Sequence, residues 1–133
     1  LKEAGARRVL PLKVSGPFHS PLLNTAGEKL AEVLAPCKLS GLKIPYISNT
    51  LAEPVTDKTK IKDLLTRQIS SPVRWRESME ELIREGVGTF IEIGPGKTLS
   101  GFLKKIDRNA VVYSIQTMED LEKTVELLKG RNL

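Results

Sequence analysis

Thr89-Phe90-Ile91-Glu92-Ile93-Gly94-Pro95-Gly96-Lys97-Thr98 is the stretch that decides the fold. Its first five residues form a nearly continuous apolar run, which is typical of a central strand in a parallel sheet. The two glycines around Pro95 predict a tight turn, because glycine adopts backbone angles that other residues avoid. Apolar residues then recur at helical spacing through Ile106. A strand that passes through a short turn into a helix indicates an α/β protein.

The same alternation extends along the rest of the chain. We expect further strands at Val9–Leu12, Ile44–Asn49 and Val111–Ile115, and a loop at Ala52–Thr56. We expect helices at Ser20–Pro36, Asp57–Ile69, Ser71–Gly86 and Thr117–Leu128, and the last turn of a helix at Leu1–Ala4. Serine followed by proline begins two of these helices, and a capping box at Thr117 begins another. Strands joined through helices predict a partial parallel sheet with flanking helices.

The composition favours one globular domain in the cytoplasm. The chain has 133 residues, of which 40% are hydrophobic and 28% charged. It has no apolar run of the ~20 residues that span a bilayer, so we expect no membrane association. The single cysteine, Cys37, cannot form an intrachain disulfide, and we expect it to be buried and inert. The beginning at Leu1, without methionine and in the middle of an element, indicates a fragment of a longer protein.

The net charge of +5 favours an acidic partner. The basic residues are spread along the chain without interleaved aromatic residues, which argues against nucleic acid. We expect most of them to belong to a solvated surface.

Two kinds of chemistry find little support in the residues. Gly96-Lys97-Thr98 follows a strand as a phosphate-binding loop does, but the first glycine of that motif would fall at position 91, which is isoleucine. A tight turn is the better interpretation. One histidine, one cysteine and scattered carboxylates give no metal-ligand spacing, so we expect no metal. Glu92, inside the apolar strand, is expected to be structural.

His19 is the only histidine, and it lies in Gly16-Pro17-Phe18-His19-Ser20-Pro21 at the beginning of an expected helix. Histidine accepts and returns a proton near neutral pH, so it could serve as a general base. A lone histidine beside a helix is more often structural, and a base also needs an acceptor to orient its second nitrogen. Gln68 is a candidate, because main-chain carbonyls at a helix C-terminus have no partner within the helix.

Four strings occur in an order and at separations that indicate a family. They are 14–22 (VSGPFHSPL), 47–49 (ISN), 67–75 (RQISSPVRW) and 92–101 (EIGPGKTLSG). Together they closely resemble the C-terminal part of the malonyl-CoA:acyl carrier protein transacylases of bacterial fatty-acid synthesis, and more distantly the acyltransferase domains of polyketide synthases. The resemblance implies that residues 1–13 end a small ferredoxin-like subdomain. Residues 14–133 would be the C-terminal part of a larger, hydrolase-like acyltransferase subdomain.

The resemblance implies acyl transfer without a cofactor. A serine takes malonyl from malonyl-CoA and passes it to the phosphopantetheine thiol of acyl carrier protein. His19 falls on the family's catalytic histidine, and Gln68 on the glutamine whose main-chain carbonyl orients it. Phe18 resembles the malonyl-selective pattern, and Asn49 is expected to line the same cleft. Lys97, Lys104 and Lys105 could form a docking patch for the acidic carrier protein.

Three parts of the family's site have no counterpart in the sequence. The chain contains no Gly-x-Ser-x-Gly elbow, and it lacks the glutamine-glycine loop of the oxyanion hole and the arginine that pairs with the malonyl carboxylate. We therefore expect the chain to be inactive alone and active with the missing N-terminal portion of the same enzyme. The alternative is a non-catalytic α/β interaction module with a basic face. A phosphate-loop protein is a third and weaker reading.

Overall fold

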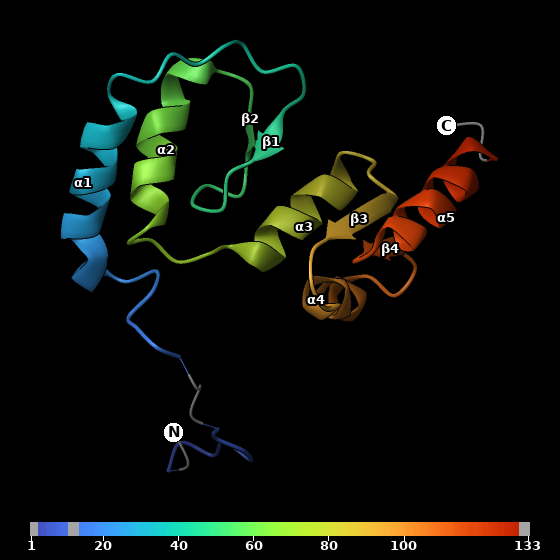
Figure 1. Ribbon diagram of the computed structural model, residues 1–133. Helices are drawn as coiled ribbons and strands as arrows, with labels where there is room; N and C mark the ends of the chain where they lie inside the picture. The colour runs from blue at the N-terminus through green and yellow to red at the C-terminus, as the bar shows by residue number, and fades with distance from the viewer. Residues whose placement is uncertain (1–2, 11–13, 131–133) are drawn as a thin grey trace.

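The elements fall into two groups that follow each other along the chain (Figure 1). The computed structural model describes residues 3–10 and 14–130. The first group contains the 3-10 turn η1 (Pro21–Leu23), α1 (Asn24–Leu34), β1 (Tyr46–Ile47), β2 (Pro54–Val55), the 3-10 turn η2 (Lys58–Lys60) and α2 (Ile61–Gln68). The second contains α3 (Trp75–Arg84), β3 (Thr89–Ile93), α4 (Thr98–Ile106), β4 (Val111–Ile115) and α5 (Met118–Lys129). The fold is α/β, as expected.

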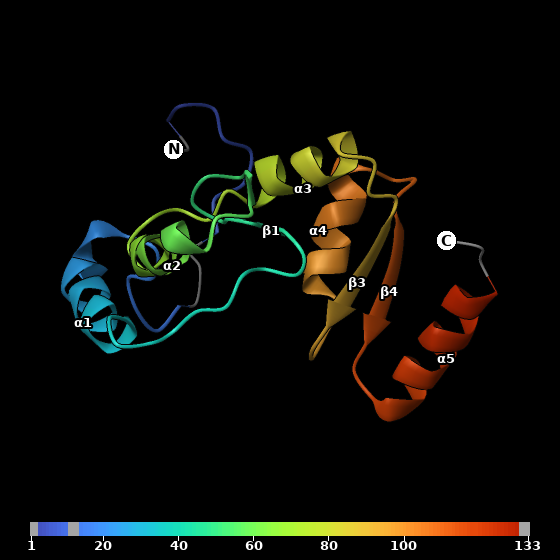
Figure 2. The ribbon, with the colours of Figure 1, turned by 90° about the horizontal axis from the view of Figure 1, so that it is seen from above.

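The second group is built on a β3–α4–β4 unit. The two strands are parallel, and their register runs from Thr89 opposite Val111 to Ile93 opposite Ile115. Figure 2 shows α4 and α5 on opposite sides of these strands, with α3 beside α4. A buried cluster of Met79, Leu103 and Ala110, with the residues packed against it, joins α3, β3, α4 and β4. The helical connection between parallel strands that the sequence predicts is therefore confirmed.

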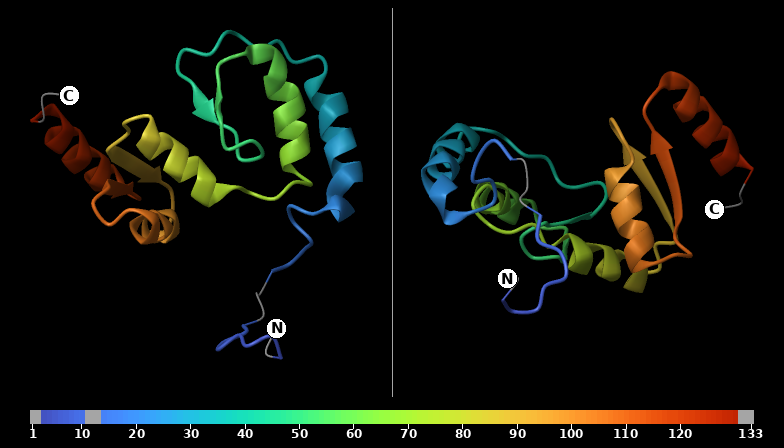
Figure 3. Two further views of the ribbon diagram at one scale, coloured as in Figure 1. Left: turned by 180° about the vertical axis from the view of Figure 1, so that it is seen from behind. Right: turned by 90° about the horizontal axis from the view of Figure 1, so that it is seen from below.

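The first group is held together by the close approach of α1 and α2, which lie side by side (Figure 3). Gly27 is buried at this contact, and a Cβ atom there would lie 3.2 Å from the main-chain oxygen of Thr66. At the other end of α1, the ammonium of Lys62 donates to the Ala35 carbonyl at 2.7 Å. A cluster of Val55, Ile61 and Leu64 forms the core of this group.

The structure corrects the extent of the parallel sheet. The strand expected at Ile44–Asn49 is reduced to β1, and it pairs antiparallel with β2, which falls in the stretch expected to be a loop. The turn between them is closed by the Ala52 N–H, which donates to the Ser48 carbonyl at 2.7 Å. Within residues 3–10 and 14–130 the parallel sheet consists of β3 and β4 alone. β3 is thus not central there, and the Ile93 side chain on it is 79% exposed.

Two other element boundaries differ from the expectation. Helix α3 begins at Trp75 rather than at Ser71, since Arg74 has a non-helical ψ of 59°; its N–H donates to the Asn49 carbonyl at 2.9 Å. Val9 and Leu10 form no strand, since no described segment pairs with them, and Leu12 lies outside the described residues. The subdomain boundary at residue 13 stays a prediction.

The start of α5 and the exposure of Cys37 test two further expectations. The capping box of α5 is confirmed, with the Thr117 side chain accepting from the Asp120 N–H and the Asp120 side chain accepting from the Thr117 N–H. Cys37 is exposed rather than buried. In the described part of the chain no helix is long and apolar enough to cross a membrane.

Gly27→Val is expected to separate α1 from α2. The branched side chain would meet the Thr66 carbonyl, which α2 holds in place, and such overpacking typically costs about 1–3 kcal/mol. Urea unfolding measures the change. Glu28→Val is the control, because position 28 is exposed on the same helix and there valine costs only a few tenths of a kcal/mol, about its helix propensity. Equal losses in both variants would contradict close packing at Gly27.

Candidate functional site

His19 is held by the last residue of α2. Its Nδ1 lies 3.0 Å from the main-chain oxygen of Gln68. A carbonyl oxygen can only accept a hydrogen bond, so this contact assigns the proton of the neutral ring to Nδ1. Nε2 is then the nitrogen that can take up a proton. The ring is exposed to solvent, where a reacting partner can reach it.

The backbone around His19 is strained. Its φ of 56° lies in the left-handed region, which costs a non-glycine residue about 1–3 kcal/mol. Ser20 precedes the 3-10 turn η1 and Pro21 begins it, but the serine hydroxyl does not cap this turn as expected. The hydroxyl donates instead to the Pro17 carbonyl at 2.7 Å, and this bond closes the short turn that presents His19.

Asn49 joins the same cluster from the other side. It follows β1, and its amide Nδ2 donates to the side-chain oxygen Oε1 of Gln68 at 3.2 Å. Gln68 thus uses its main-chain carbonyl for His19 and its side chain for Asn49. The structure brings together three of the expected site residues, from the turn before η1, the turn after β1 and the end of α2. Phe18 adjoins His19 in the chain; its ring lies over Gly16 and is 63% exposed.

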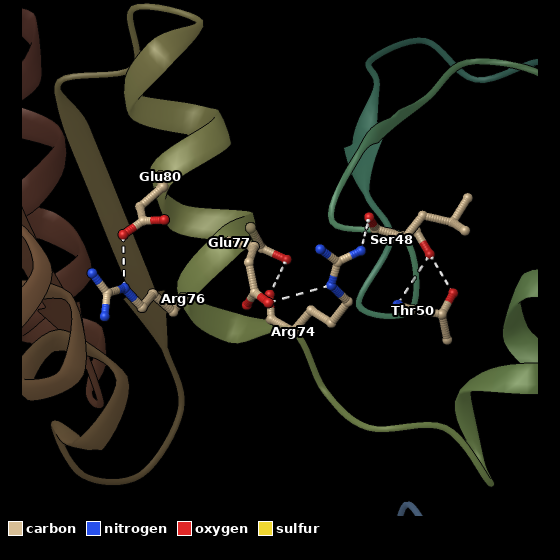
Figure 4. A network of polar contacts seen from close by, with 8 residues as sticks. Ser48, Thr50, Arg74, Arg76, Glu77 and Glu80 are labelled. Atoms are coloured by element: carbon tan, nitrogen blue, oxygen red, sulfur yellow. Dashed lines mark hydrogen bonds and ion pairs between the residues drawn. The ribbon is translucent and has the colours of Figure 1, made fainter.

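Arg74 is a residue whose part in this cluster the sequence did not reveal. Its N–H donates to the Asn49 carbonyl, and its guanidinium Nη1 donates to the Leu51 carbonyl at 2.8 Å. Figure 4 shows it reaching from the beginning of α3 toward the turn that carries Ser48 and Thr50. Its place within the Arg67–Trp75 string was a signal, but a charged residue in a string does not disclose its partner.

The three lysines of the expected docking patch lie at the two ends of α4, in the second group of elements, whereas His19 precedes η1 of the first group. Lys97 precedes the helix, whereas Lys104 and Lys105 lie in its last turn, about 10 Å further along the axis. The Lys104 ammonium donates to the carbonyls of Arg108 and Ala110 and fastens the turn into β4. Lys105 lies 5.7 Å from the centre of the Phe102 ring. Lys104 therefore has a structural role, and Lys105 is the better candidate for a partner contact.

Side chains of the protein itself accept hydrogen bonds from the glycine loop after β3 and from the beginning of α4. The Glu92 carboxylate accepts from the N–H groups of Leu99 and Ser100 and from the Ser100 hydroxyl. The Gly96 N–H donates to the side-chain oxygen of Gln116 at 2.8 Å. Glu92 and Gln116 thus occupy donors that a bound phosphate would need. Gly94 and Gly96 have φ of 140° and 88°, as the tight turn requires.

These hydrogen bonds also affect the charge of Glu92. The Ser100 hydroxyl and the two N–H groups stabilise the carboxylate and lower its pKa from 4.5.

In residues 3–10 and 14–130 no group of three or more His, Cys, Asp or Glu side chains could hold a metal ion.

Comparison with known proteins gives close matches over almost the whole chain, although no family model matches. The malonyl CoA-acyl carrier protein transacylase of Bacillus subtilis (strain 168) is 50% identical over 131 residues, covering 98% of this chain and 41% of that protein. The corresponding protein of Staphylococcus aureus (strain COL) is 46% identical over 121 residues, covering 91% of this chain and 39% of that protein.

Solved structures agree. The structure of MCAT from Streptococcus pneumoniae has a TM-score of 0.88 at 48% identity, over 95% of this chain and 41% of that one. A malonyl-transacylase in complex with a type II PKS acyl-carrier protein has a TM-score of 0.87 at 36% identity, over 95% and 41%.

The fold is therefore that of the acyltransferases, represented by part of their length. More specifically, the chain is homologous to the C-terminal portion of the malonyl CoA-acyl carrier protein transacylases. It spans about two fifths of the length of these relatives, 41% in the Bacillus subtilis protein.

Glu92→Gln is expected to change how stability depends on pH. Because the pKa of Glu92 is lowered by folding, its stabilisation is present above 4.5 and is lost as pH falls through the lower pKa of the folded state. The melting temperature of the glutamine variant should lie below that of the parent near neutral pH, and the difference should shrink as the pH falls below 4.5 and through the lowered pKa of Glu92. Glu32→Gln, at an exposed position of α1, is the control. A constant difference across this range would contradict the stabilisation of the carboxylate.

Proposed function

We propose that the chain supplies the proton-transfer half of a malonyl-CoA:acyl carrier protein transacylase site. His19 is the general base, and the main-chain carbonyl of Gln68 is its orienting acceptor. The 3.0 Å contact between His19 Nδ1 and the Gln68 oxygen carries this proposal, because it leaves Nε2 as the basic nitrogen. The identity of about 50% to a malonyl CoA-acyl carrier protein transacylase supports the substrate class.

The proposed reaction has two acyl transfers. In the first, Nε2 takes the proton of a serine hydroxyl while the serine oxygen attacks the thioester carbonyl of malonyl-CoA. The Gln68 carbonyl stabilises the imidazolium that forms, and the imidazolium protonates the departing thiolate of coenzyme A. The second transfer repeats these steps in reverse, with the phosphopantetheine thiol attacking the malonyl-serine ester. The thiol proton passes to Nε2 and then to the serine oxygen, and no cofactor is required.

The serine belongs to a segment outside these 133 residues in this proposal, because the sequence contains no Gly-x-Ser-x-Gly elbow. Asn49 and Phe18 would contribute to the wall of the acyl site from their places beside Gln68 and His19. One structural neighbour is a malonyl-transacylase bound to its acyl-carrier protein, which supports a carrier protein as the acceptor. The cytoplasmic location stays a prediction.

Transfer of malonyl to carrier protein should require both the chain and the portion that precedes it in the relatives. We expect no transfer by residues 1–133 alone and full transfer when that portion is joined or bound. In the joined protein His19→Ala should reduce kcat by about 100-fold or more, the scale of general base catalysis. Radiolabelled malonyl-CoA and holo acyl carrier protein give the rate.

Gln68→Ala is the matched comparison for this loss. It keeps the main-chain carbonyl that His19 uses and removes only the side-chain bond to Asn49, so kcat should fall a few-fold at most, by roughly the value of one hydrogen bond. Transfer by the chain alone, or undiminished transfer by His19→Ala, would refute the proposed role. The second result would favour a non-catalytic module.

Lys105→Glu is expected to raise the KM for carrier protein in the joined enzyme. The exposed ammonium at the end of α4 is proposed to meet the acidic carrier, and reversal of one rim charge changes encounter more than chemistry. The increase should be larger at low salt, where screening is weak. Lys29→Glu, exposed on α1, is the control with the same charge change. A similar KM in both variants would show that Lys105 is only a solvated charge.

A further inference from the structure

We propose that Arg74 is a positioning residue for His19, which it influences through the turn after β1 and through Gln68. The inference rests on the proposed role of His19 as the base. Arg74 does not touch His19. It holds the far end of a chain of hydrogen bonds whose near end is the contact between His19 Nδ1 and the Gln68 carbonyl.

The chain of contacts is continuous. The Arg74 guanidinium donates to the Leu51 carbonyl at 2.8 Å, and the Arg74 N–H donates to the Asn49 carbonyl at 2.9 Å. The Asn49 side chain donates to the Gln68 side chain at 3.2 Å. Gln68 in turn accepts from His19. Arg74 thus holds both ends of the three-residue segment 49–51.

The turn between these two attachments is stiff. Ser48 is buried, with 3% of its surface exposed, and its hydroxyl bonds the Thr50 hydroxyl at 2.8 Å and accepts from the Thr50 N–H at 3.3 Å. Ala52 closes the turn with a left-handed φ of 57°. A segment with this many internal bonds moves as a unit, so a displacement at Leu51 passes to Asn49.

The other end of Arg74 is anchored to α3. Its main-chain carbonyl accepts from the N–H and the hydroxyl of Ser78, which is 2% exposed. Its Nε also approaches Glu77 at 3.4 Å, but both side chains of this pair are nearly half exposed, and such pairs contribute little. The bond to the Leu51 carbonyl is therefore the contact that carries the positioning. It connects the beginning of α3 to the group of elements that holds His19.

The orientation of the Gln68 carbonyl explains why His19 would respond. Gln68 is the last residue of α2, where the carbonyl has no partner in its own helix and its direction depends on local restraints. The bond from Asn49 to the Gln68 side chain is one of these restraints. When it weakens, the acceptor for Nδ1 is less fixed, and the proton of the neutral ring can move to Nε2. A ring protonated at Nε2 cannot act as the base.

The test is Arg74→Ala in the joined enzyme, with two readouts. Nitrogen NMR of labelled histidine, with the His19 signals assigned by their loss in His19→Gln, should show a smaller fraction of the Nδ1-protonated ring. The kcat for malonyl transfer should fall a few-fold, no further than in Gln68→Ala, with KM for malonyl-CoA unchanged, because misplacement of a catalytic group affects the chemical step. Arg74→Lys, which keeps a donor on a flexible stem, should restore part of both readouts.

Two variants separate this role from general effects on α3. Arg76→Ala removes a guanidinium that bonds only Glu80 on the same helix, and Glu77→Gln removes the ion pair but leaves the bond to Leu51. Both should keep the parent tautomer and kcat. If Arg74→Ala fails to fold, Arg74→Lys serves as the test, because it should also lower the fraction of the Nδ1-protonated ring, though by less.

A parent-like tautomer in folded Arg74→Ala, or in Arg74→Lys where Arg74→Ala does not fold, would overturn the inference, as would an equal shift in Arg76→Ala. The NMR readout does not depend on transfer. Loss of the proposed function would instead appear as normal transfer by His19→Ala, so the two failures are distinguishable.

Discussion

The carbonyl at the end of α2 is the group on which the candidate site depends. A helix leaves its last carbonyls without partners, and Gln68 offers one of them to the imidazole of His19. Its position follows from the packing of α1 against α2, which the lack of a side chain at Gly27 permits. The bond from Asn49 then restrains the same residue from the opposite side. The packing of the two helices and the turn after β1 therefore restrain one residue, Gln68.

Local patterns predicted the parts of the fold that depend on neighbours in sequence. The β3–α4–β4 unit followed from an apolar strand, a glycine turn and a helical repeat, and the beginning of α5 followed from Thr117 and Asp120. Gln68 was also accessible as a candidate acceptor, because the end of a helix marks a free carbonyl, but the residues alone did not show that it meets His19. The assignment of the chain to a family required four separate strings, since a lone histidine at a helix start is an ambiguous signal.

Features that depend on distant partners were not accessible in the same way. β1 and β2 are two residues each, too short for an alternating pattern to stand out. Helix α3 begins at Trp75, although serine followed by proline suggested an earlier start, and the residue before it, Arg74, bonds Asn49, which is 25 positions away. Arg74 itself looked like one more surface charge. The partner of Arg74 is set by the fold and not by its neighbours in sequence.

The left-handed backbone at His19 has a consequence for how the chain could be altered. Glycine adopts this conformation without strain and asparagine tolerates it well, so the position favours residues other than histidine on backbone energy alone. Selection of variants for thermal stability alone would tend to replace His19 and keep the conformation of the turn. Under the proposed role of His19 as the base, the strain of this backbone is a cost in stability that the site bears for the imidazole, and changes that stabilise the fold would have to leave this residue in place.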